Sequence, residues 1–328
     1  MRNNNLSIHY PIKMIPTFKD YIWGGNRLIK EWGKPSPYEV AAESWELSAH
    51  KNGQSVAENG SLKGKQLSEI IEAYGKQCLG TNSQDADRFP ILIKLIDSRQ
   101  KLSIQVHPDD SYALTNEGDY GKTEMWYIVE AQEGSGILCG FKNDMTKTEY
   151  RESIQNNTVI DKLNWIEVKK GDVFFISPGT VHAICEGTII AEIQQNSDVT
   201  YRVYDYDRKG PDGSSRPLHI EKAMDVSRLS KDIYDGKSLG AKIDIPGAKC
   251  TLLAKCCYFT VKEYEINDSC NLTVGAKSFQ SLLFVEGRGI LKWGGDEIEF
   301  KRGDTFFLPA KMGDYTIVGN TTVLISEV

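Results

Sequence analysis

The sequence predicts a mainly β protein made of two related jelly-roll β-sandwiches, with a few short helices in its first half. Two observations predict this class. Short apolar runs rich in Val, Ile, Phe and Tyr are separated by Gly-Asp, Gly-Gly and Pro-Gly pairs, which is typical of strands joined by turns. A second observation is that one order of strands and turns occurs twice along the chain.

Each strand is predicted where an apolar run ends at a turn signal. The clearest strands are Pro90–Ile96, Met125–Val129, Asp172–Ile176, Thr188–Ile193, Ser281–Val285 and Thr305–Leu308. Helical spacing of apolar residues occurs in the first 230 residues, at Leu67–Cys78, Thr146–Ile154 and Ile220–Leu229. Another short helix is expected after Pro108, because Asp109 and Asp110 make good helix caps.

The internal repeat predicts two domains. Its first copy is Tyr127–Glu130 followed by Gly171–Pro178, and its second copy is Leu283–Glu286 followed by Gly303–Pro309. This order of strand, turn, strand, Gly-Asp, strand and Pro is typical of the cupin jelly roll. We therefore expect a catalytic domain over residues 1–235, with helical insertions, and a cupin-like domain over residues 236–328.

The two copies differ where chemistry would occur. Four residues beyond Pro178 is His182, whereas the equivalent position in the second copy is Gly313. Six residues before the last Glu of the first strand is Glu124 in one copy and Gln280 in the other. Packing alone would not require His and Glu in only one copy, so we place the functional site in the first and expect no metal ligands in the second.

Four side chains of the first copy form a candidate metal site. Gln105 and His107 are two residues apart and so face the same way on a strand, while Glu124 opens the next predicted strand. His182 follows a Pro-Gly turn between two small apolar residues. Two imidazoles, one carboxylate and one amide oxygen suit zinc or a similar divalent ion. The alternative is that both histidines are hydrogen-bonded residues of the sandwich and Glu124 is solvated.

Several charged residues occur in apolar runs, where an unpaired charge would be costly. They are Lys94, Glu192 and Arg202, and Lys122 lies two residues before Glu124. Two lysines and an arginine near a cation site suggest an anionic ligand such as a phosphate ester. The alternative is that each lies on the solvated face of a sheet.

Bulk properties exclude several classes of function. The chain has 328 residues and a net charge of −6, and no Lys/Arg block suggests a nucleic-acid surface. No run is long enough to span a membrane, and the polar N-terminus lacks an apolar signal core. Seven cysteines without regular spacing fit a reducing compartment. We expect a cytoplasmic protein, either a monomer or a small homo-oligomer.

Six segments resemble type I mannose-6-phosphate isomerases, in order and between about residues 10 and 229. The chain is similar to the compact bacterial branch, which lacks a large inserted helical domain. The matching segments are Tyr21–Gly25, Ala42–Glu46, Lys101–Asp109, Gly121–Met125, Pro178–Ala183 and Ser197–Arg202.

The resemblance implies a role for each candidate residue. One zinc per chain would be held by Gln105, His107, Glu124 and His182. Arg202, Lys122, Glu192 and Asp198 would act in catalysis, and Lys94, Ser103 and Lys122 would contact the phosphosugar. The chain departs from the longer enzymes after Arg202, where Val203–Arg208 replaces an Ala-Gly-Leu-Thr run, and at Ile184, where Tyr is common.

The reaction implied is the interconversion of mannose 6-phosphate and fructose 6-phosphate through a cis-enediol. The sequence does not choose among Glu192, Lys122 and Asp198 for the proton transfer, nor between Lys94 and Lys122 for the phosphate. Two rivals are another metal cupin, such as a phosphoglucose isomerase or an iron oxygenase, and a sugar-sensing cupin without activity. Gln105 and the basic residues favour the phosphosugar over O₂ chemistry, and the intact first copy argues against a sensor.

Overall fold

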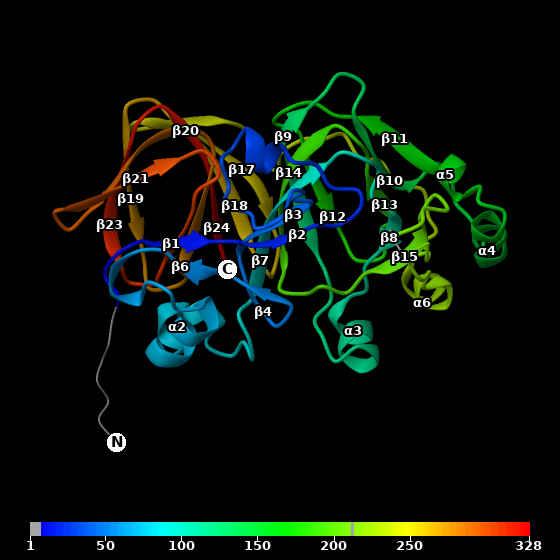
Figure 1. The fold of residues 1–328 in the computed structure, drawn as a ribbon, viewed down its shortest axis with the longest axis horizontal. Helices are drawn as coiled ribbons and strands as arrows, with labels where there is room; N and C mark the ends of the chain where they lie inside the picture. The colour runs from blue at the N-terminus through cyan, green and yellow to red at the C-terminus, as the bar shows by residue number, and fades with distance from the viewer. Residues whose placement is uncertain (1–7, 211–212) are drawn as a thin grey trace. The chain divides into compact units, whose positions relative to one another are not determined.

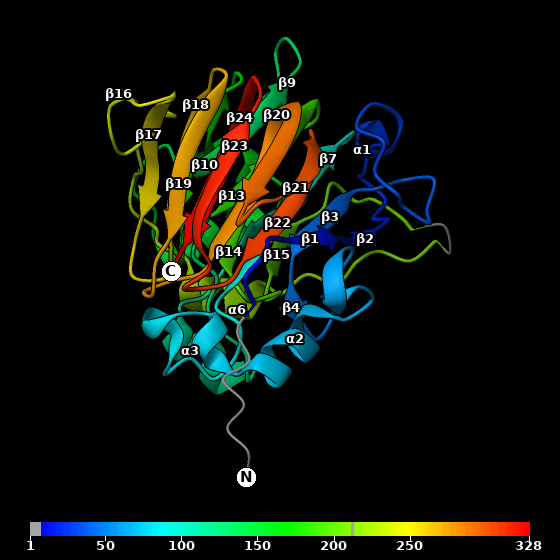
Figure 2. The same ribbon diagram turned by 90° about the vertical axis from the view of Figure 1, so that its left-hand side faces the viewer.

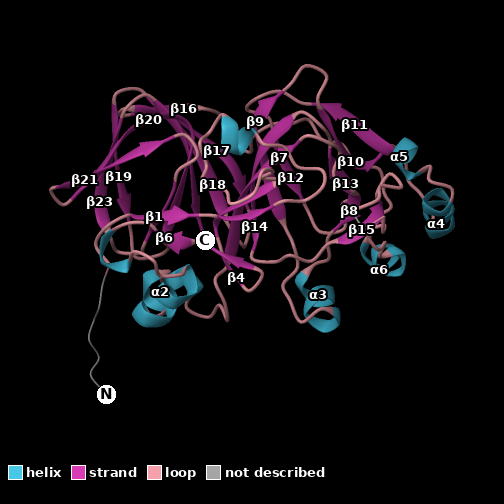
Figure 3. Ribbon diagram, viewed as in Figure 1, coloured by secondary structure: helices cyan, strands magenta, loops and turns pink. Residues whose placement is uncertain are grey.

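The short apolar runs form strands in the computed structural model, which describes residues 8–210 and 213–328 (Figure 3). The chain divides into two units by its internal contacts. The central unit contains Phe18–Ser44 and Lys94–Lys237. The C-terminal unit contains Ser238–Val328, together with Trp45–Ile93 and the segment that ends at Thr17. The unit boundaries fall inside the strands β2 (Thr17–Lys19), β3 (Glu43–Leu47) and β7 (Ile91–Ser98).

The central unit is built on two sheets, as a jelly roll requires. The six-stranded sheet has the order β12 (Val173–Ile176), β9 (Glu124–Ala131), β14 (Thr188–Gln195), β7 (Ile91–Ser98), β3 (Glu43–Leu47) and β2 (Thr17–Lys19). The five-stranded sheet has the order β11 (Leu163–Glu167), β10 (Gly136–Phe141), β13 (His182–Ile184), β8 (Ile104–Val106) and β15 (Tyr201–Tyr204). The predicted mainly β fold is confirmed.

Alternation along the five-stranded sheet separates an apolar face from a polar one. Ile104 and Val106 on β8, and Val181 and Ala183 around β13, belong to a hydrophobic cluster with residues of three helices. These helices are α4 (Lys147–Gln155), α5 (Val159–Lys162) and α6 (Ile220–Val226), which lie beside this sheet in Figure 1. Gln105 and His182 alternate with the apolar residues, so they face the opposite side.

The predicted helices occur with short boundary shifts. Helix α4 begins after Thr146, whose side chain accepts a hydrogen bond from the Glu149 amide and caps the helix. Helix α3 (Asp110–Asn116) is the expected helix after Pro108, and the Asp109 side chain caps it at the Tyr112 amide. The apolar pattern over Leu67–Cys78 forms α2 (Leu67–Tyr74), which ends at Gly75 before a 3₁₀ turn. The short helix α1 (Arg27–Lys30) was not predicted from the sequence.

The C-terminal unit is an antiparallel strand assembly along which β17, β18, β24 and β20 lie side by side (Figure 2). The strands from residue 238 onward are β16 (Ile243–Ile245), β17 (Ala248–Lys255), β18 (Thr260–Ile266), β19 (Ser269–Val274), β20 (Gln280–Trp293), β21 (Asp296–Lys301), β22 (Thr305–Leu308), β23 (Gly313–Val318) and β24 (Thr321–Glu327). Their core contains Phe284 stacked on Phe300, with ring centroids 3.7 Å apart.

The division of the chain differs from the predicted domains 1–235 and 236–328. Strand β1 (Ile12–Ile15) pairs with β22, with Ile12 opposite Phe307, and β6 (Val56–Ala57) pairs with β1. Early residues therefore extend the sheet of the C-terminal unit. Strand pairing links residues far apart in sequence, and a boundary taken from the repeat alone misses it. A two-stranded hairpin, β4 (Ala49–His50) and β5 (Gly53–Gln54), completes the strands.

Candidate metal centre and active site

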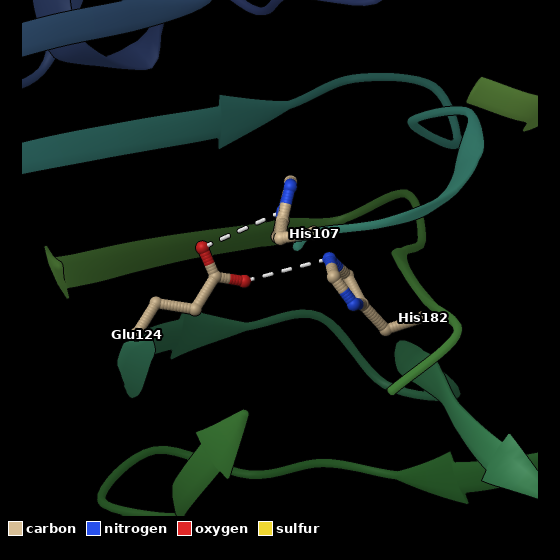
Figure 4. A group of neighbouring side chains, drawn as sticks. All are labelled: His107, Glu124 and His182. Atoms are coloured by element: carbon tan, nitrogen blue, oxygen red, sulfur yellow. Dashed lines mark ion pairs between the residues drawn. The ribbon is translucent and has the colours of Figure 1, made fainter. Parts of the chain in front are cut away.

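Three strands of the central unit bring His107, Glu124 and His182 together. His107 directly follows β8, Glu124 is the first residue of β9, and His182 is the first residue of β13. All three side chains are buried, and one ligand atom from each lies within 4.8 Å of the others. Figure 4 shows both imidazoles directed at the two oxygens of the Glu124 carboxylate. The predicted cluster of two histidines and one glutamate is therefore present.

Backbone carbonyls fix which nitrogen of each imidazole carries the proton. His107 Nδ1 lies 2.9 Å from the Val199 carbonyl oxygen, and His182 Nδ1 lies 2.9 Å from that of Thr180. A carbonyl only accepts, so each Nδ1 donates and each Nε2 keeps a lone pair. His107 Nε2 lies 3.7 Å and His182 Nε2 3.4 Å from the Glu124 oxygens. This arrangement is typical of metal-binding histidines.

The charge state of these groups suits a cation. Burial lowers the pKa of His182 to about 4, and burial with the nearby Lys122 charge holds the pKa of His107 well below its usual range. Burial also raises the pKa of Glu124, and a cation at its oxygens would restore the ionised form. Glu124 Oε1 and His182 Nε2 are buried without a hydrogen-bond partner. A divalent ion would satisfy them, so the donor set fits zinc or a similar metal.

Gln105 and Arg202 lie in one row with His182 across three strands. Gln105 is opposite His182 on one side and opposite Arg202 on the other. Directly paired residues present their side chains on the same face of a sheet, so all three face away from the helices. Arg202 Nη1 donates to the Pro217 carbonyl at 2.9 Å, and its buried Nε has no hydrogen-bond partner. The role of Gln105 as a fourth ligand stays a prediction.

Lys122 lies directly beside the cluster. Its ammonium nitrogen is 3.0 Å from Glu124 Oε2 and 3.2 Å from His107 Nε2. Its side chain is 5% exposed, which excludes a solvated sheet face. The predicted proximity of Lys122 to Glu124 is confirmed.

Lys94 and Glu192 form a second buried charge network next to the first. Lys94 Nζ lies 3.2 Å from Glu192 Oε1 and 3.5 Å from Glu43 Oε2, and Lys122 lies 3.9 Å from the same Glu192 oxygen. Burial opposes ionisation of Glu192, but Lys122 and Lys94 outweigh it and hold the pKa of Glu192 below its usual value. Burial likewise opposes the charge of Lys94, but Glu43 and Glu192 raise the pKa of Lys94. Both groups are therefore charged at neutral pH.

Asp198 and Ser103 are less closely defined. Asp198 lies in the segment before β15, and its charge is close enough to raise the pKa of Lys94, after the larger effects of burial, Glu43 and Glu192. Ser103 is buried just before β8. Their contacts with substrate stay predictions.

Three further residues, Glu43, Tyr21 and Trp126, belong to the site, although the sequence did not predict a role for them. Glu43 pairs with Lys94, and Tyr21 has its pKa raised by burial and by the charges of Glu43 and Asp198. Trp126 Nε1 donates to Glu192 Oε2 at 3.1 Å, and its ring contacts the His182 ring edge-on. Alternation along the strand could have predicted the place of Trp126, because it lies two residues after Glu124 and so faces the same side. Trp126 is also paired with Glu192 on the neighbouring strand.

In the second copy of the repeat, residues that hydrogen-bond to one another stand where the first copy has its expected metal ligands. Gln280, at the position equivalent to Glu124, accepts from the Tyr315 hydroxyl at 2.7 Å and donates to Glu327 at 2.6 Å. Gly313, equivalent to His182, has a φ of +93° at the start of β23. These residues offer a metal no imidazole or free carboxylate.

No helix among residues 8–210 and 213–328 combines the length and the apolar character that a membrane crossing needs.

Comparison with known proteins agrees with the geometry. The model of the type I phosphomannose isomerase catalytic domain matches residues 12–143, and that of the mannose-6-phosphate isomerase cupin domain matches residues 248–328. A mannose-6-phosphate isomerase of Bacillus subtilis is 38% identical over 97% of this chain and 98% of its own length. One from Streptococcus mutans is 38% identical over 93% of this chain and 94% of its own length.

Solved structures give the same result. The crystal structure of the mannose 6-phosphate isomerase from Bacillus subtilis superposes with a TM-score of 0.90 at 39% identity, over 97% of this chain and 99% of that chain. A mannose 6-phosphate isomerase bound with zinc and yttrium has a TM-score of 0.76 at 17% identity, over 96% of this chain and 98% of that chain, and supports the fold alone. This chain belongs to the type I mannose-6-phosphate isomerase family.

Proposed function

We propose that this chain interconverts mannose 6-phosphate and fructose 6-phosphate at the His107–Glu124–His182 cluster, with one zinc ion per chain. One observation carries the proposal. Two buried imidazole lone pairs converge on a buried carboxylate, directly beside paired lysine and glutamate side chains. Such a site can hold a metal and also holds groups that accept and return a proton.

The metal ligands are His107, Glu124 and His182, with Gln105 as the fourth. One carboxylate and three neutral ligands leave a divalent ion with about one net positive charge. Zinc held there would supply a Lewis acid for the reacting oxygens of the open-chain sugar. The carbonyls of Val199 and Thr180 hold the imidazoles in the tautomer that this role needs.

The isomerisation moves one proton between neighbouring carbons. A base removes the proton from C2 of the aldose, the C1–C2 double bond forms, and O1 gains a proton to give the cis-enediol. Loss of the O2 proton and protonation at C1 then give the ketose. Glu192 is ionised and fixed between two lysines, so it suits the base, while Lys122 and Asp198 can exchange protons with the sugar oxygens. Arg202 stabilises the negative charge of the intermediate.

Lys94, Ser103 and Lys122 contact the substrate in this proposal. Lys94 is held in place by Glu43 and Glu192, so its ammonium group presents a fixed donor. The substrate is a small phosphosugar, and we expect the enzyme to act in the cytoplasm as a monomer or a small homo-oligomer.

Deuterium exchange tests the enediol. The purified, zinc-loaded protein is incubated with mannose 6-phosphate in D₂O, and the fructose 6-phosphate formed is analysed by proton NMR. We expect deuterium at C1, because a proton abstracted by a side chain exchanges with solvent at least in part. Product formed with no exchange would contradict a route through Glu192. Turnover that depends on O₂, or sugar binding without turnover, would contradict the isomerase itself.

A further inference from the structure

The loop after β15 brings two arginines onto one aspartate. Asp205 accepts hydrogen bonds from Arg216 Nε at 2.7 Å and Arg216 Nη2 at 2.6 Å, and it also accepts one from Arg208. Arg208 Nη1 donates at 2.6 Å to the carbonyl of Lys101, two residues before Ser103. This is the segment in which the sequence departs from the longer enzymes.

These side chains carry an excess of positive charge. Arg208 and Arg216 share the single carboxylate of Asp205, and Arg202 is close enough for both arginines, after its own burial, to lower the pKa of Arg202. Three guanidinium groups and one carboxylate leave a net charge of about +2. The Asp205 side chain is 7% exposed and that of Arg216 is 27% exposed, so the cation lies nearer to solvent. Because Arg216 meets Asp205 through Nε and Nη2, its Nη1 remains for another acceptor.

Tyr21 connects this cluster to the metal centre. Burial raises the pKa of its phenol, and the charges of Glu43, Asp198, Lys94 and Arg216 all act on it. Arg216 and Lys94 are therefore both close enough to the Tyr21 phenol for their charges to act on its pKa. Arg202 also connects the arginine loop with the metal centre, because it lies in the same row of paired strand residues as Gln105 and His182.

The buried lysines are poor partners for a phosphate by comparison. Lys94 and Lys122 are enclosed by Glu43, Glu192 and Glu124, so two positive charges face three carboxylates. With zinc bound, these groups carry a net charge of only about +1, and the developing negative charge at the reacting end of the sugar needs it, whereas the arginine loop offers about +2 to a phosphate ester of charge about −1.5 to −2. Forked guanidinium groups suit a phosphate better than a lysine that already has two acidic partners.

We infer that Arg216 and Arg208 form the subsite for the 6-phosphate of the substrate, with Asp205 holding the two guanidinium groups in register. The inference rests on the proposed function, since it names the phosphate site of that reaction. In this inference, different residues bind the phosphate group and act on the reacting carbons of the sugar. The arginine loop binds the phosphate end, and Lys94 and Lys122 remain for the reacting end.

Binding to the chelated full-length protein tests the subsite without turnover. Fructose 6-phosphate and fructose are titrated calorimetrically into the wild type, Arg216→Gln and Arg208→Gln. We expect each variant to weaken binding of fructose 6-phosphate about tenfold or more, because a charge-assisted hydrogen bond is lost, and to leave binding of fructose unchanged. With zinc restored, KM for mannose 6-phosphate rises and kcat changes by less than about threefold.

Lys209→Gln is the matched control. Lys209 carries the same charge on the same loop but is exposed and donates to Ser215 at 2.8 Å, so this variant should bind like the wild type. The inference is overturned if Arg216→Gln binds fructose 6-phosphate as the wild type does, or if fructose binding falls equally. It is also overturned if the wild type does not prefer the phosphorylated sugar. Arginine-dependent binding without isomerisation would support the subsite and contradict only the proposed function.

Discussion

At the residue scale, the central feature is a group of buried nitrogen and oxygen atoms that all offer lone pairs. The imidazole Nε2 atoms and the Glu124 carboxylate offer lone pairs, and the Nδ1 protons already bind carbonyls. Such a set is unfavourable in an apolar interior unless a cation completes it. The same reasoning makes Arg202 a candidate for the negative charge that develops on the substrate.

Arg202→Ala should lower kcat by about a hundredfold or more and leave zinc content unchanged. Removing a donor from developing negative charge typically has this effect, and Arg202 is not a metal ligand. A coupled assay and metal analysis check both quantities. Arg151→Ala is the control, because Arg151 is exposed and pairs only with Glu221 among the contacts described. Equal activity of Arg202→Ala and the wild type would refute its role.

Proton release on zinc binding tests the charge states of the ligands. In the zinc-free protein, burial lowers the pKa of His182 to about 4 and lowers that of His107, while it raises the pKa of Glu124 to about 7. At pH 5.5 the imidazoles are therefore already neutral and Glu124 is protonated. Zinc should then displace about one proton per chain, from Glu124.

The measurement is calorimetry in two buffers of different ionisation enthalpy. At pH 8.5 we expect almost no proton release, since Glu124 is then ionised as well. Release of about three protons at pH 5.5, one from Glu124 and two from the imidazoles, would show that both histidines titrate near their ordinary pKa of 6.5, contrary to this account.

At the element scale, strand register places the chemistry. The row Arg202–Gln105–His182 crosses three strands, and Glu192 on β14 is paired with Trp126 on β9. The sequence predicted that Glu124 opens a strand, and this is confirmed. The side chain of His182 faces away from its two apolar neighbours, as alternation along a strand requires, and alternation is a local property. Which strands are neighbours is a non-local property, and this is why the row itself was not predicted.

Gly24 shows how tightly the strands are packed near the site. A Cβ at Gly24 would lie 2.3 Å from the Cβ of Ala42, and Gly24 forms an isolated bridge with Ser98. Gly24→Ala should therefore lower the free energy of unfolding by about 1–3 kcal/mol through overpacking. Urea unfolding at a fixed zinc concentration measures the change. Gly275→Ala is the control, with no atom within 4 Å of the added Cβ, and unchanged stability of Gly24→Ala would contradict the packing.

At the scale of the whole molecule, a repeated arrangement of strands holds the candidate metal ligands in its first copy and lacks them at the equivalent positions of its second. The repeat and the missing ligands of the second copy could be predicted because they depend on residue types at fixed spacing. The assignment of the N-terminal strands could not, since β1 and β6 pair with strands of the C-terminal unit. The cluster of Arg208 and Arg216 around Asp205 was also missed, because the sequence does not show that side chains on one loop share a carboxylate.

The asymmetry of the copies predicts one zinc per chain. Glu124→Ala should lower zinc affinity at least about a hundredfold, because it removes the only carboxylate among the expected ligands. Gln280→Ala, at the equivalent position, should leave zinc affinity unchanged. It should lower stability by about 1–3 kcal/mol, because Tyr315 and Glu327 lose a buried partner. Loss of zinc from Gln280→Ala would contradict the asymmetry.

The most direct test of the account is activity measured against zinc occupancy. The chelated protein is titrated with zinc, and at each step bound metal and the rate of mannose 6-phosphate isomerisation are recorded, with His182→Ala in parallel. We predict that the rate rises linearly to a maximum at one zinc per chain and that His182→Ala stays inactive at that ratio. Full activity in metal-free protein, or in His182→Ala, would contradict a catalytic metal at the His107–Glu124–His182 cluster.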